Sequence, residues 1–372
     1  MALRVLVVPD KFKGTLTARQ AAAAIGRGWS AARPGDTLEL LPMSDGGDGF
    51  GDILGELLEA ESVTTRTVDA AHRPTESVWW WHAPTSTAII ESAGVIGLAM
   101  LPPGKYHPFE LDTQGLGAVF KAAAGRGARR CLIGIGGSAT NDGGFGLARS
   151  LGWQFFNAHQ EVISRWTGLH DLVTVRPPDQ TSLFEEFQVA VDVRNPLLGP
   201  EGCSRIYGPQ KGLTEFELAE RCLGQLSAVL EKQLQLRHAD EPGAGAAGGL
   251  GFGLRSFAGA RLEPGFELFA RFARIEERLR RAQLVLTGEG SLDASTLMGK
   301  GVGAIAQICK STGVPCIGLA GVITDAAQAA AAFTAAHALT PEFTTAGESM
   351  REPAVWLERL AAKAAAEWPA PR

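Results

Sequence analysis

Short apolar runs alternate with stretches of helical spacing at both ends of the chain. Continuous apolar runs are typical of strands buried in a parallel sheet, and amphipathic helices usually connect such strands. The first two runs and the last three therefore predict an α/β fold with a five-stranded, doubly wound parallel sheet. The runs lie at residues 3–8, 37–41, 283–286, 314–319 and 337–339.

Capping residues and glycines predict where these elements begin and end. Thr17 and Gln20 form a capping-box pair at the start of an alanine-rich helix. In the last quarter we expect a loop over residues 288–293 and a glycine turn at Gly321. Apolar residues at helical spacing over 268–279 predict one amphipathic helix.

The centre of the chain has a different pattern. Short strands with polar flanks follow one another over residues 63–91, and one of them carries the tryptophan run 79–81. Successive side chains of a strand point to opposite faces, so this run predicts packing on both faces rather than a platform for stacked bases. We expect residues 78–282 to form a second α/β domain, inserted into a discontinuous domain of residues 1–77 and 283–372.

A glycine-rich loop follows the apolar run at residues 131–135. Over residues 136–144 it contains two Gly-Gly pairs, separated by small polar residues and one carboxylate. Glycine tolerates positive φ and lets a ligand approach the backbone, so such a loop can turn N–H groups toward an anion, assisted by the helix that follows. A phosphate or carboxylate cradle and a plain strand-to-helix turn are both compatible with this pattern.

Other charged residues stand at predicted strand ends, where open parallel sheets bind their ligands. Lys13 follows the first strand and fits either an anion clamp or a solvated surface lysine. Asp45 and Asp48 lie among glycines after the second strand, a composition that suits Mg²⁺, although Asp48 could instead cap the next helix. Asp192 interrupts or ends the strand 187–193, so it is a general base, a metal ligand, or an aspartate that anchors the next turn.

Two nucleotide-binding signatures are not met by this sequence. Residues 243–248 match G-x-G-x-x-G, but they follow a helix and a polar run rather than a strand, so we expect a glycine loop that leads into a helix. A Walker A motif is absent, because Gly299-Lys300 is followed by Gly301 rather than by Ser or Thr.

Composition and charge narrow the function. The net charge is −5, and Lys and Arg are spread along the chain, which argues against a nucleic-acid or membrane surface. The five cysteines are scattered without metal-ligand spacing and indicate buried thiols in a reducing compartment. Neither a secretory leader nor a long apolar run is evident. We expect a cytoplasmic, soluble protein with a small-molecule ligand.

In order and spacing, these motifs resemble the type 1 glycerate kinase family across essentially the whole chain. The matching segments are 10–14, 45–49, 133–144, Asp192 with 195–197, 208–212, 242–245 and 287–290 with Asp293. The resemblance implies a flavodoxin-like domain interrupted by a second α/β domain. It also implies phosphorylation of D-glycerate by MgATP at the 2-hydroxyl, in organic-acid catabolism. A homodimer is a possible assembly.

Joining the residues to the resemblance gives a hypothesis for the site, in a cleft between the two domains. Phosphoryl transfer needs charge neutralisation, in-line positioning and a proton acceptor. We assign Asp192 as the base, Lys13 as a phosphate or carboxylate clamp, and Asp45 and Asp48 as Mg²⁺ ligands. The expected substrate- or phosphate-binding residues are Gly136, Gly137, Ser138, Asn141, Asp142, Asn195, Lys211, Glu289 and Asp293.

The chain departs from the family pattern in places. Lys11 stands where a serine is usual, Asp48 replaces a glutamate, and Ser291 replaces a common arginine; Gln114 lies in a segment that is usually Thr-Tyr-Gly. Two other function classes stay open from the residues alone. One is an NAD-dependent dehydrogenase of a small hydroxy acid, and the other is a non-catalytic sensor of an organic acid.

Overall fold

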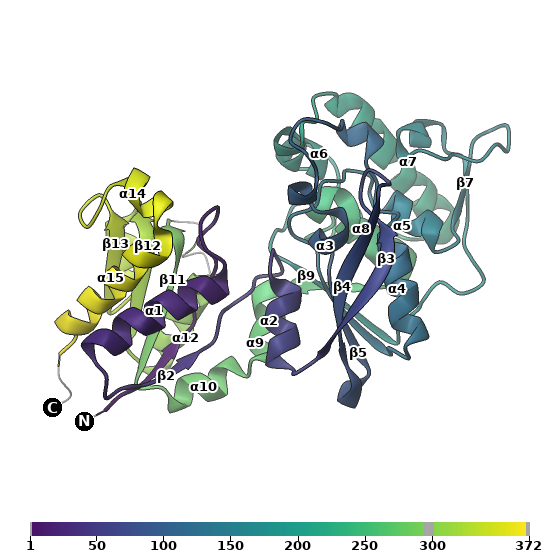
Figure 1. Cartoon of the computed structure of the whole chain (residues 1–372). Coiled ribbons are helices and arrows are strands. Elements are labelled where there is room, and N and C mark those ends of the chain that lie inside the picture. Colours follow the sequence, from purple (N-terminus) through teal and green to yellow (C-terminus); the bar gives the residue numbers. More distant parts are fainter. Residues whose placement is uncertain (1, 294–295, 297–300, 370–372) are drawn as a thin grey trace. The chain divides into compact units, whose positions relative to one another are not determined.

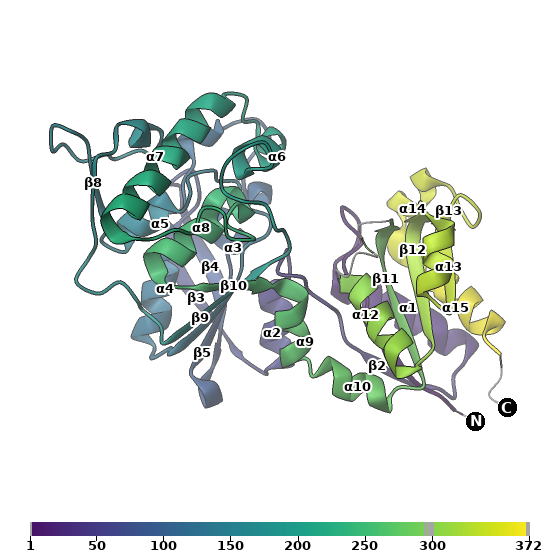
Figure 2. The ribbon, with the colours of Figure 1, turned by 180° about the vertical axis from the view of Figure 1, so that it is seen from behind.

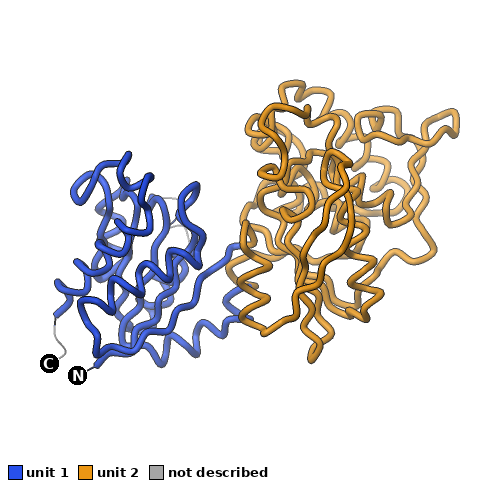
Figure 3. Tube along the Cα trace, in the orientation of Figure 1, with its two compact units in different colours: residues 1–45, 269–372 blue, residues 46–268 orange. Residues whose placement is uncertain are grey.

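The computed structural model describes residues 2–293, 296 and 301–369, and the chain divides into two compact units (Figure 3). Unit 1 comprises residues 1–45 and 269–372, and unit 2 comprises residues 46–268. The boundaries therefore differ from the predicted ones at 77/78 and 282/283. The reason is that residues 46–77 contribute a helix and a strand to unit 2, and that strand pairs along its whole length with the next one.

Unit 1 is built on a parallel sheet in the order β13-β12-β11-β1-β2, which confirms the predicted five strands. Helices α1 and α15 cover one face and α12 covers the other (Figures 1 and 2). The elements are β1 (Arg4–Val7), α1 (Ala18–Ala32), β2 (Thr37–Leu40), α10 (Ile275–Arg281), β11 (Leu284–Leu292), α12 (Gly301–Thr312), β12 (Cys316–Ile323), α13 (Ala326–Ala332), β13 (Ala335–Thr340), α14 (Ala346–Arg351) and α15 (Pro353–Glu367). Helix α9 (Gly265–Phe272) spans the boundary between the units.

The predicted capping box starts α1. The Thr17 hydroxyl accepts a hydrogen bond from the Gln20 N–H, and the Gln20 side chain accepts one from the Thr17 N–H. Trp29, near the end of this helix, is fully buried in a core shared with apolar residues of α15 and the sheet.

Three predictions for the last quarter were wrong. Residues 288–292 and Gly321 belong to strands β11 and β12, because pairing between these strands continues to Leu292 and Ile323. A side chain at Gly321 would lie 2.5 Å from the Gly290 carbonyl oxygen, so this glycine allows close approach of two strands rather than a turn. The single helix expected over 268–279 is two helices, broken at Arg274 with a φ of 48°.

Unit 2 contains a six-stranded mixed sheet in the order β10-β9-β6-β5-β4-β3. Its strands are β3 (Glu61–Val68), β4 (Pro74–His82), β5 (Thr87–Glu91), β6 (Arg130–Gly134), β9 (Glu186–Val191) and β10 (Arg261–Pro264), and β7 (Gln154–Phe156) and β8 (Thr174–Arg176) form a separate pair. The α-helices are α2 (Phe50–Leu57), α3 (Ala93–Ile96), α4 (Leu116–Gly125), α5 (Phe145–Ser150), α6 (Cys203–Tyr207), α7 (Phe216–Leu234) and α8 (Ala246–Ala258). The glycine loop at 243–248 leads into α8 and follows no strand, as predicted.

The tryptophan run of β4 packs on both faces of this sheet, as predicted. Trp79 is buried in the main core of unit 2, and its indole N–H donates to the Thr65 hydroxyl. Trp80 faces the opposite way and lies against α2, where a side chain at Gly51 or Gly55 would overlap its ring. The run is therefore a packing feature.

The five cysteines are free and buried, as the sequence predicted. Among the described residues, no helix combines the length and the apolar character needed to cross a membrane.

Candidate functional site

The glycine-rich loop connects β6 to α5 in unit 2. The backbone has positive φ at Gly137, Gly143 and Gly144, the conformations for which glycine is favoured. The Gly136 N–H donates to the Gly46 carbonyl oxygen at 3.2 Å, so this member of the predicted cradle has an internal partner. The N–H groups of Gly137 and Ser138 have no hydrogen-bond acceptor among the described residues.

Asp48 lies against this loop. A side chain at Gly137 would come within 2.3 Å of an Asp48 carboxylate oxygen, so only glycine fits there. The proposal that Asp48 caps α2 is wrong, because the N-cap is Gly49 and the Glu91 carboxylate accepts from the N–H groups of Gly49 and Gly51, each at 3.0 Å. Burial, together with the Asp48 charge, raises the pKa of Glu91.

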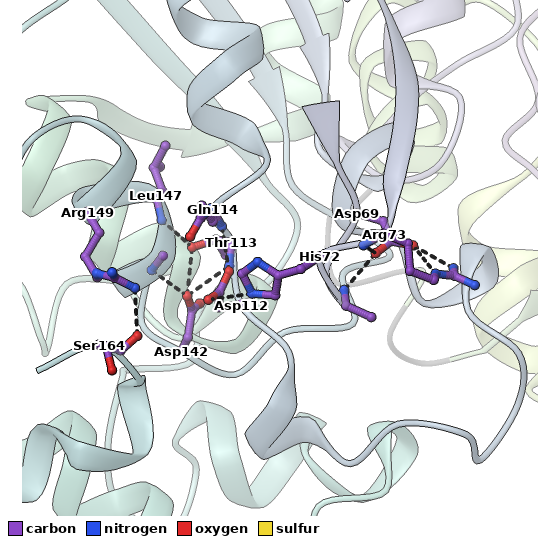
Figure 4. Close-up of polar contacts among 12 residues, drawn as sticks. Asp69, His72, Arg73, Asp112, Thr113, Gln114, Asp142, Leu147, Arg149 and Ser164 are labelled. Carbon is purple, nitrogen blue, oxygen red and sulfur yellow. Dashed lines mark hydrogen bonds and ion pairs between the residues drawn. The ribbon is translucent and has the colours of Figure 1, made fainter. Parts of the chain in front are cut away.

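Asp142 was expected to contact substrate, but the structure gives its carboxylate an internal role (Figure 4). It is fully buried and accepts hydrogen bonds from the N–H and hydroxyl of Thr113 and from the N–H groups of Gly144 and Gly146. The Thr113 hydroxyl also accepts from the Leu147 N–H. Burial, and next the charge of Asp112, raise the pKa of Asp142 to about 6. This carboxylate fixes the end of the loop and the first turn of α5.

A second pair of side chains extends this network toward solvent. Asp112 accepts from the Gln114 N–H through one oxygen, and its other oxygen lies 3.1 Å from Nε2 of the half-exposed His72 (Figure 4). The backbone on both sides of Thr113 is thereby anchored, and Gln114, a departure from the family pattern, contributes through its main chain.

The predicted site residues Asn141 and Lys211 make hydrogen bonds that hold the glycine-rich loop, Asn141 from within the loop and Lys211 from another segment. The Asn141 amide donates to the Ser204 hydroxyl at 2.9 Å. Lys211, which is only 7% exposed, donates to the Ser138 hydroxyl at 3.2 Å and to the Thr140 carbonyl oxygen at 2.7 Å. Burial lowers the pKa of Lys211 to about 8, against the opposing effects of Cys203 and Asp142.

Asp192 and Asn195 follow β9 and differ in surroundings. The Asn195 side chain accepts from the Tyr207 hydroxyl and donates to the Glu201 carbonyl oxygen, so it holds its own loop together. Asp192 is exposed just beyond the end of the strand. Burial, and next the Asp192 charge, raise the pKa of Tyr207 to about 12. The aspartate is therefore a solvent-facing carboxylate rather than a buried one.

In unit 1, acidic side chains gather at the carboxyl ends of the strands. Asp10 is 9% exposed and accepts from the Lys11 N–H at 2.7 Å. Burial, and next the charge of Asp45, with a smaller effect of Glu289, raise the pKa of Asp10 to about 7. The Lys11 ammonium lies 3.7 Å from an Asp45 oxygen. From the sequence, Asp10 was placed at a strand end but was given no role. Its position directly after a buried strand could have identified it as a candidate site residue.

The next two predicted site residues of unit 1 are Lys13 and Asp293. Lys13 is exposed. Asp293 accepts from the Thr296 N–H at 3.1 Å.

The acidic group of unit 1 has the donor chemistry that Mg²⁺ requires. Carboxylate oxygens are hard ligands, and the charges of Asp45 and Glu289 disfavour the ionised Asp10 carboxylate, an effect that a cation relieves. Asp45 belongs to unit 1 and Asp48 to unit 2. Within the described part of the chain, no three His, Cys, Asp or Glu side chains stand close enough together to hold a metal ion on their own. A hydrated ion that also takes phosphate oxygens needs only one or two carboxylates.

Comparison with known proteins identifies relatives over the whole length of the chain. Residues 5–369 match the family described as "Glycerate kinase family". The glycerate kinase of Halalkalibacterium halodurans is 35% identical, with 96% of both chains covered. The glycerate 2-kinase of Escherichia coli is 34% identical over 87% of this chain and 86% of its own. The crystal structure of a putative glycerate kinase 2 from Salmonella typhimurium superimposes with a TM-score of 0.83 at 31% identity, covering 98% of each chain.

We predict that Asp142→Ala destabilises unit 2 by about 3–5 kcal/mol, because it leaves buried donors without an acceptor. Asp142→Asn should cost less at neutral pH, since one amide oxygen still accepts. Because the pKa of Asp142 is higher in the folded than in the unfolded state, protonation of this carboxyl stabilises the fold. That contribution is complete at low pH and is lost as pH rises from about 4 through about 6. The measurement is denaturant unfolding at pH 4 and pH 7.

Asp142→Asn does not titrate, so its stability relative to wild type should improve by roughly 3 kcal/mol across that interval, at about 1.36 kcal/mol per pKa unit. A pH-independent difference between the two proteins would contradict the assigned pKa. An alanine variant as stable as wild type would remove Asp142 from its anchoring role.

Proposed function

The chain belongs to the glycerate kinase family, and on this premise we propose that it transfers the γ-phosphoryl group of ATP to D-glycerate. The observation that carries the proposal is the loop at 136–144, whose open N–H groups at Gly137 and Ser138 suit an oxyanion. The name of the E. coli relative supports the 2-hydroxyl as acceptor and 2-phospho-D-glycerate as product.

We propose that Mg²⁺ accompanies ATP and is held by Asp45, with Asp48 as a further ligand. When bound, the ion neutralises phosphate charge during transfer. The crowding of carboxylates around Asp10 in unit 1 supports this assignment, because their repulsion favours a cation. Glu289 adds to the same negative field.

The remaining roles are assigned from exposure and reach. Asp192 is proposed as the base that accepts the proton of the attacking hydroxyl, since it is exposed and therefore accessible to a substrate. Lys13 is exposed and carries its charge on a long, flexible stem, which suits a clamp on a phosphate or carboxylate.

The two other function classes find no support in the comparisons, whose named relatives are glycerate kinases. A role in organic-acid catabolism, a cytoplasmic location and a homodimeric assembly stay predictions.

Incubation with D-glycerate, ATP and Mg²⁺ should give ADP and 2-phosphoglycerate, identified by ³¹P NMR of the reaction mixture. Formation of 3-phosphoglycerate would overturn the regiochemistry alone. No phosphorylated product would overturn the function, and NAD(H) fluorescence titration would then test the dehydrogenase alternative.

Replacement of Asp192 by Asn should lower kcat by about 10²–10⁴-fold with little change in thermal stability, because an exposed amide cannot accept the proton. The matched control is Asp179→Asn, at another exposed loop aspartate of unit 2. Near-normal turnover of the Asp192 variant would remove it from the role of base.

A further inference from the structure

We propose that Lys211 is a positioning residue: its buried ammonium holds the Ser138 hydroxyl so that the hydroxyl donates its own proton to a bound oxyanion. This inference rests on the proposed function, because the oxyanion is the carboxylate of the acceptor or a phosphate of the nucleotide. It also replaces the expectation that Lys211 contacts substrate directly.

The position of Lys211 excludes it from the surface of the loop. It ends the short 3₁₀ helix η5 (Pro209–Lys211) and is 7% exposed. Two of its three ammonium protons go to the Ser138 hydroxyl and the Thr140 carbonyl oxygen. Ser138 is itself only 6% exposed and is the chain neighbour of the exposed Gly137.

The charge of this ammonium is not neutralised by a direct ion pair. Within the described residues, no carboxylate forms a salt bridge with Lys211. The ionisable groups that act on it are the Asp142 carboxyl from the loop and the Cys203 thiol from α6. Asp142 directs its oxygens to Thr113, Gly144 and Gly146 instead. A buried cation in this situation attracts an anion to the nearest accessible surface.

The Ser138 hydroxyl links the Lys211 ammonium to the proposed anion through hydrogen bonds. A serine hydroxyl has one proton to donate and two lone pairs to accept. Lys211 occupies a lone pair, and no acceptor for the hydroxyl proton is found among the described residues. The proton is therefore available to an anion beside the N–H groups of Gly137 and Ser138. A hydroxyl that accepts from an ammonium is polarised and becomes a stronger donor.

The segment that carries Lys211 also supports the next part of the loop. Ser204, on α6, accepts from the Asn141 amide, so α6 and η5 together hold residues 138–141 from below. The side-chain amide oxygen of Asn141 (Oδ1) and the Thr140 hydroxyl are buried without a partner in the described chain. Ser204 thus fixes the Asn141 side chain, and Lys211 fixes the backbone at Thr140.

A double-mutant cycle tests the proposal with wild type, Lys211→Met, Ser138→Ala and the double variant. Methionine keeps the length of the buried stem without its charge. Each single variant should raise the KM of one substrate by about 10–100-fold, the range of a charge-assisted hydrogen bond, with a smaller change in kcat. The double variant should be no worse than Ser138→Ala, because the lysine acts through that hydroxyl. A rise for D-glycerate identifies the carboxylate, and a rise for ATP identifies the phosphate.

The control is Ser256→Ala in α8, which removes another buried hydroxyl, one without a partner in the described chain, and should leave both KM values unchanged. Independent, additive effects of the two single variants would overturn the proposal, as would a folded Lys211→Met protein with both KM values unchanged. If Lys211→Met does not fold, Ser138→Ala alone decides, because unchanged KM values for it contradict the role of the hydroxyl.

Failure of this inference and failure of the proposed function give different results. A wild-type protein that forms no phosphoglycerate refutes the function. Calorimetric titration of the same four proteins with D-glycerate and with MgATP then still measures whether Lys211 and Ser138 act as one unit on a bound anion.

Discussion

The loop at the end of β6 depends on one buried carboxylate. Asp142 has no exposure to water, and it is tolerated in the interior because Thr113, Gly144 and Gly146 donate hydrogen bonds to it. The same bonds bend a glycine-rich chain, which has high conformational freedom, into a single path from strand to helix. The shape of the candidate anion site is thereby set by contacts inside unit 2, before any ligand is bound.

Each unit contains a buried ionisable side chain of opposite type, Lys211 in unit 2 and Asp10 in unit 1. In unit 2 a lysine without an ion pair lies beneath the loop, and its field favours an anion. In unit 1 the charges of Asp45 and Glu289 act on the buried Asp10 carboxyl and raise its pKa, so a cation beside Asp10 and Asp45 would be favoured. A kinase needs both kinds of environment, because phosphoryl transfer combines metal-bound phosphates with an anionic acceptor. The charges around the two sites are therefore those expected of a member of the glycerate kinase family.

The sequence predicted the sheet of unit 1 and the capping box of α1 because both depend on local patterns. It failed where tertiary contacts override local signals. Gly321 was taken for a turn, although it serves close strand approach, and Asp48 was given a capping role that Glu91 performs from a distant strand. Asp142 and Lys211 were expected to bind substrate or phosphate, but their burial was not predicted. Burial depends on which other segments pack against the loop. The sequence of residues 203–211 contains no pattern that predicts this packing.

The most direct test of the account is amide hydrogen exchange, resolved to single residues, on the ligand-free protein. If buried partners shape the loop, the amides of Gly144 and Gly146 should exchange slowly without substrate, while the open amide of Gly137 exchanges fast. Fast exchange at all three glycines, with protection appearing only after D-glycerate or MgATP is added, would contradict the claim that the anion site is preformed.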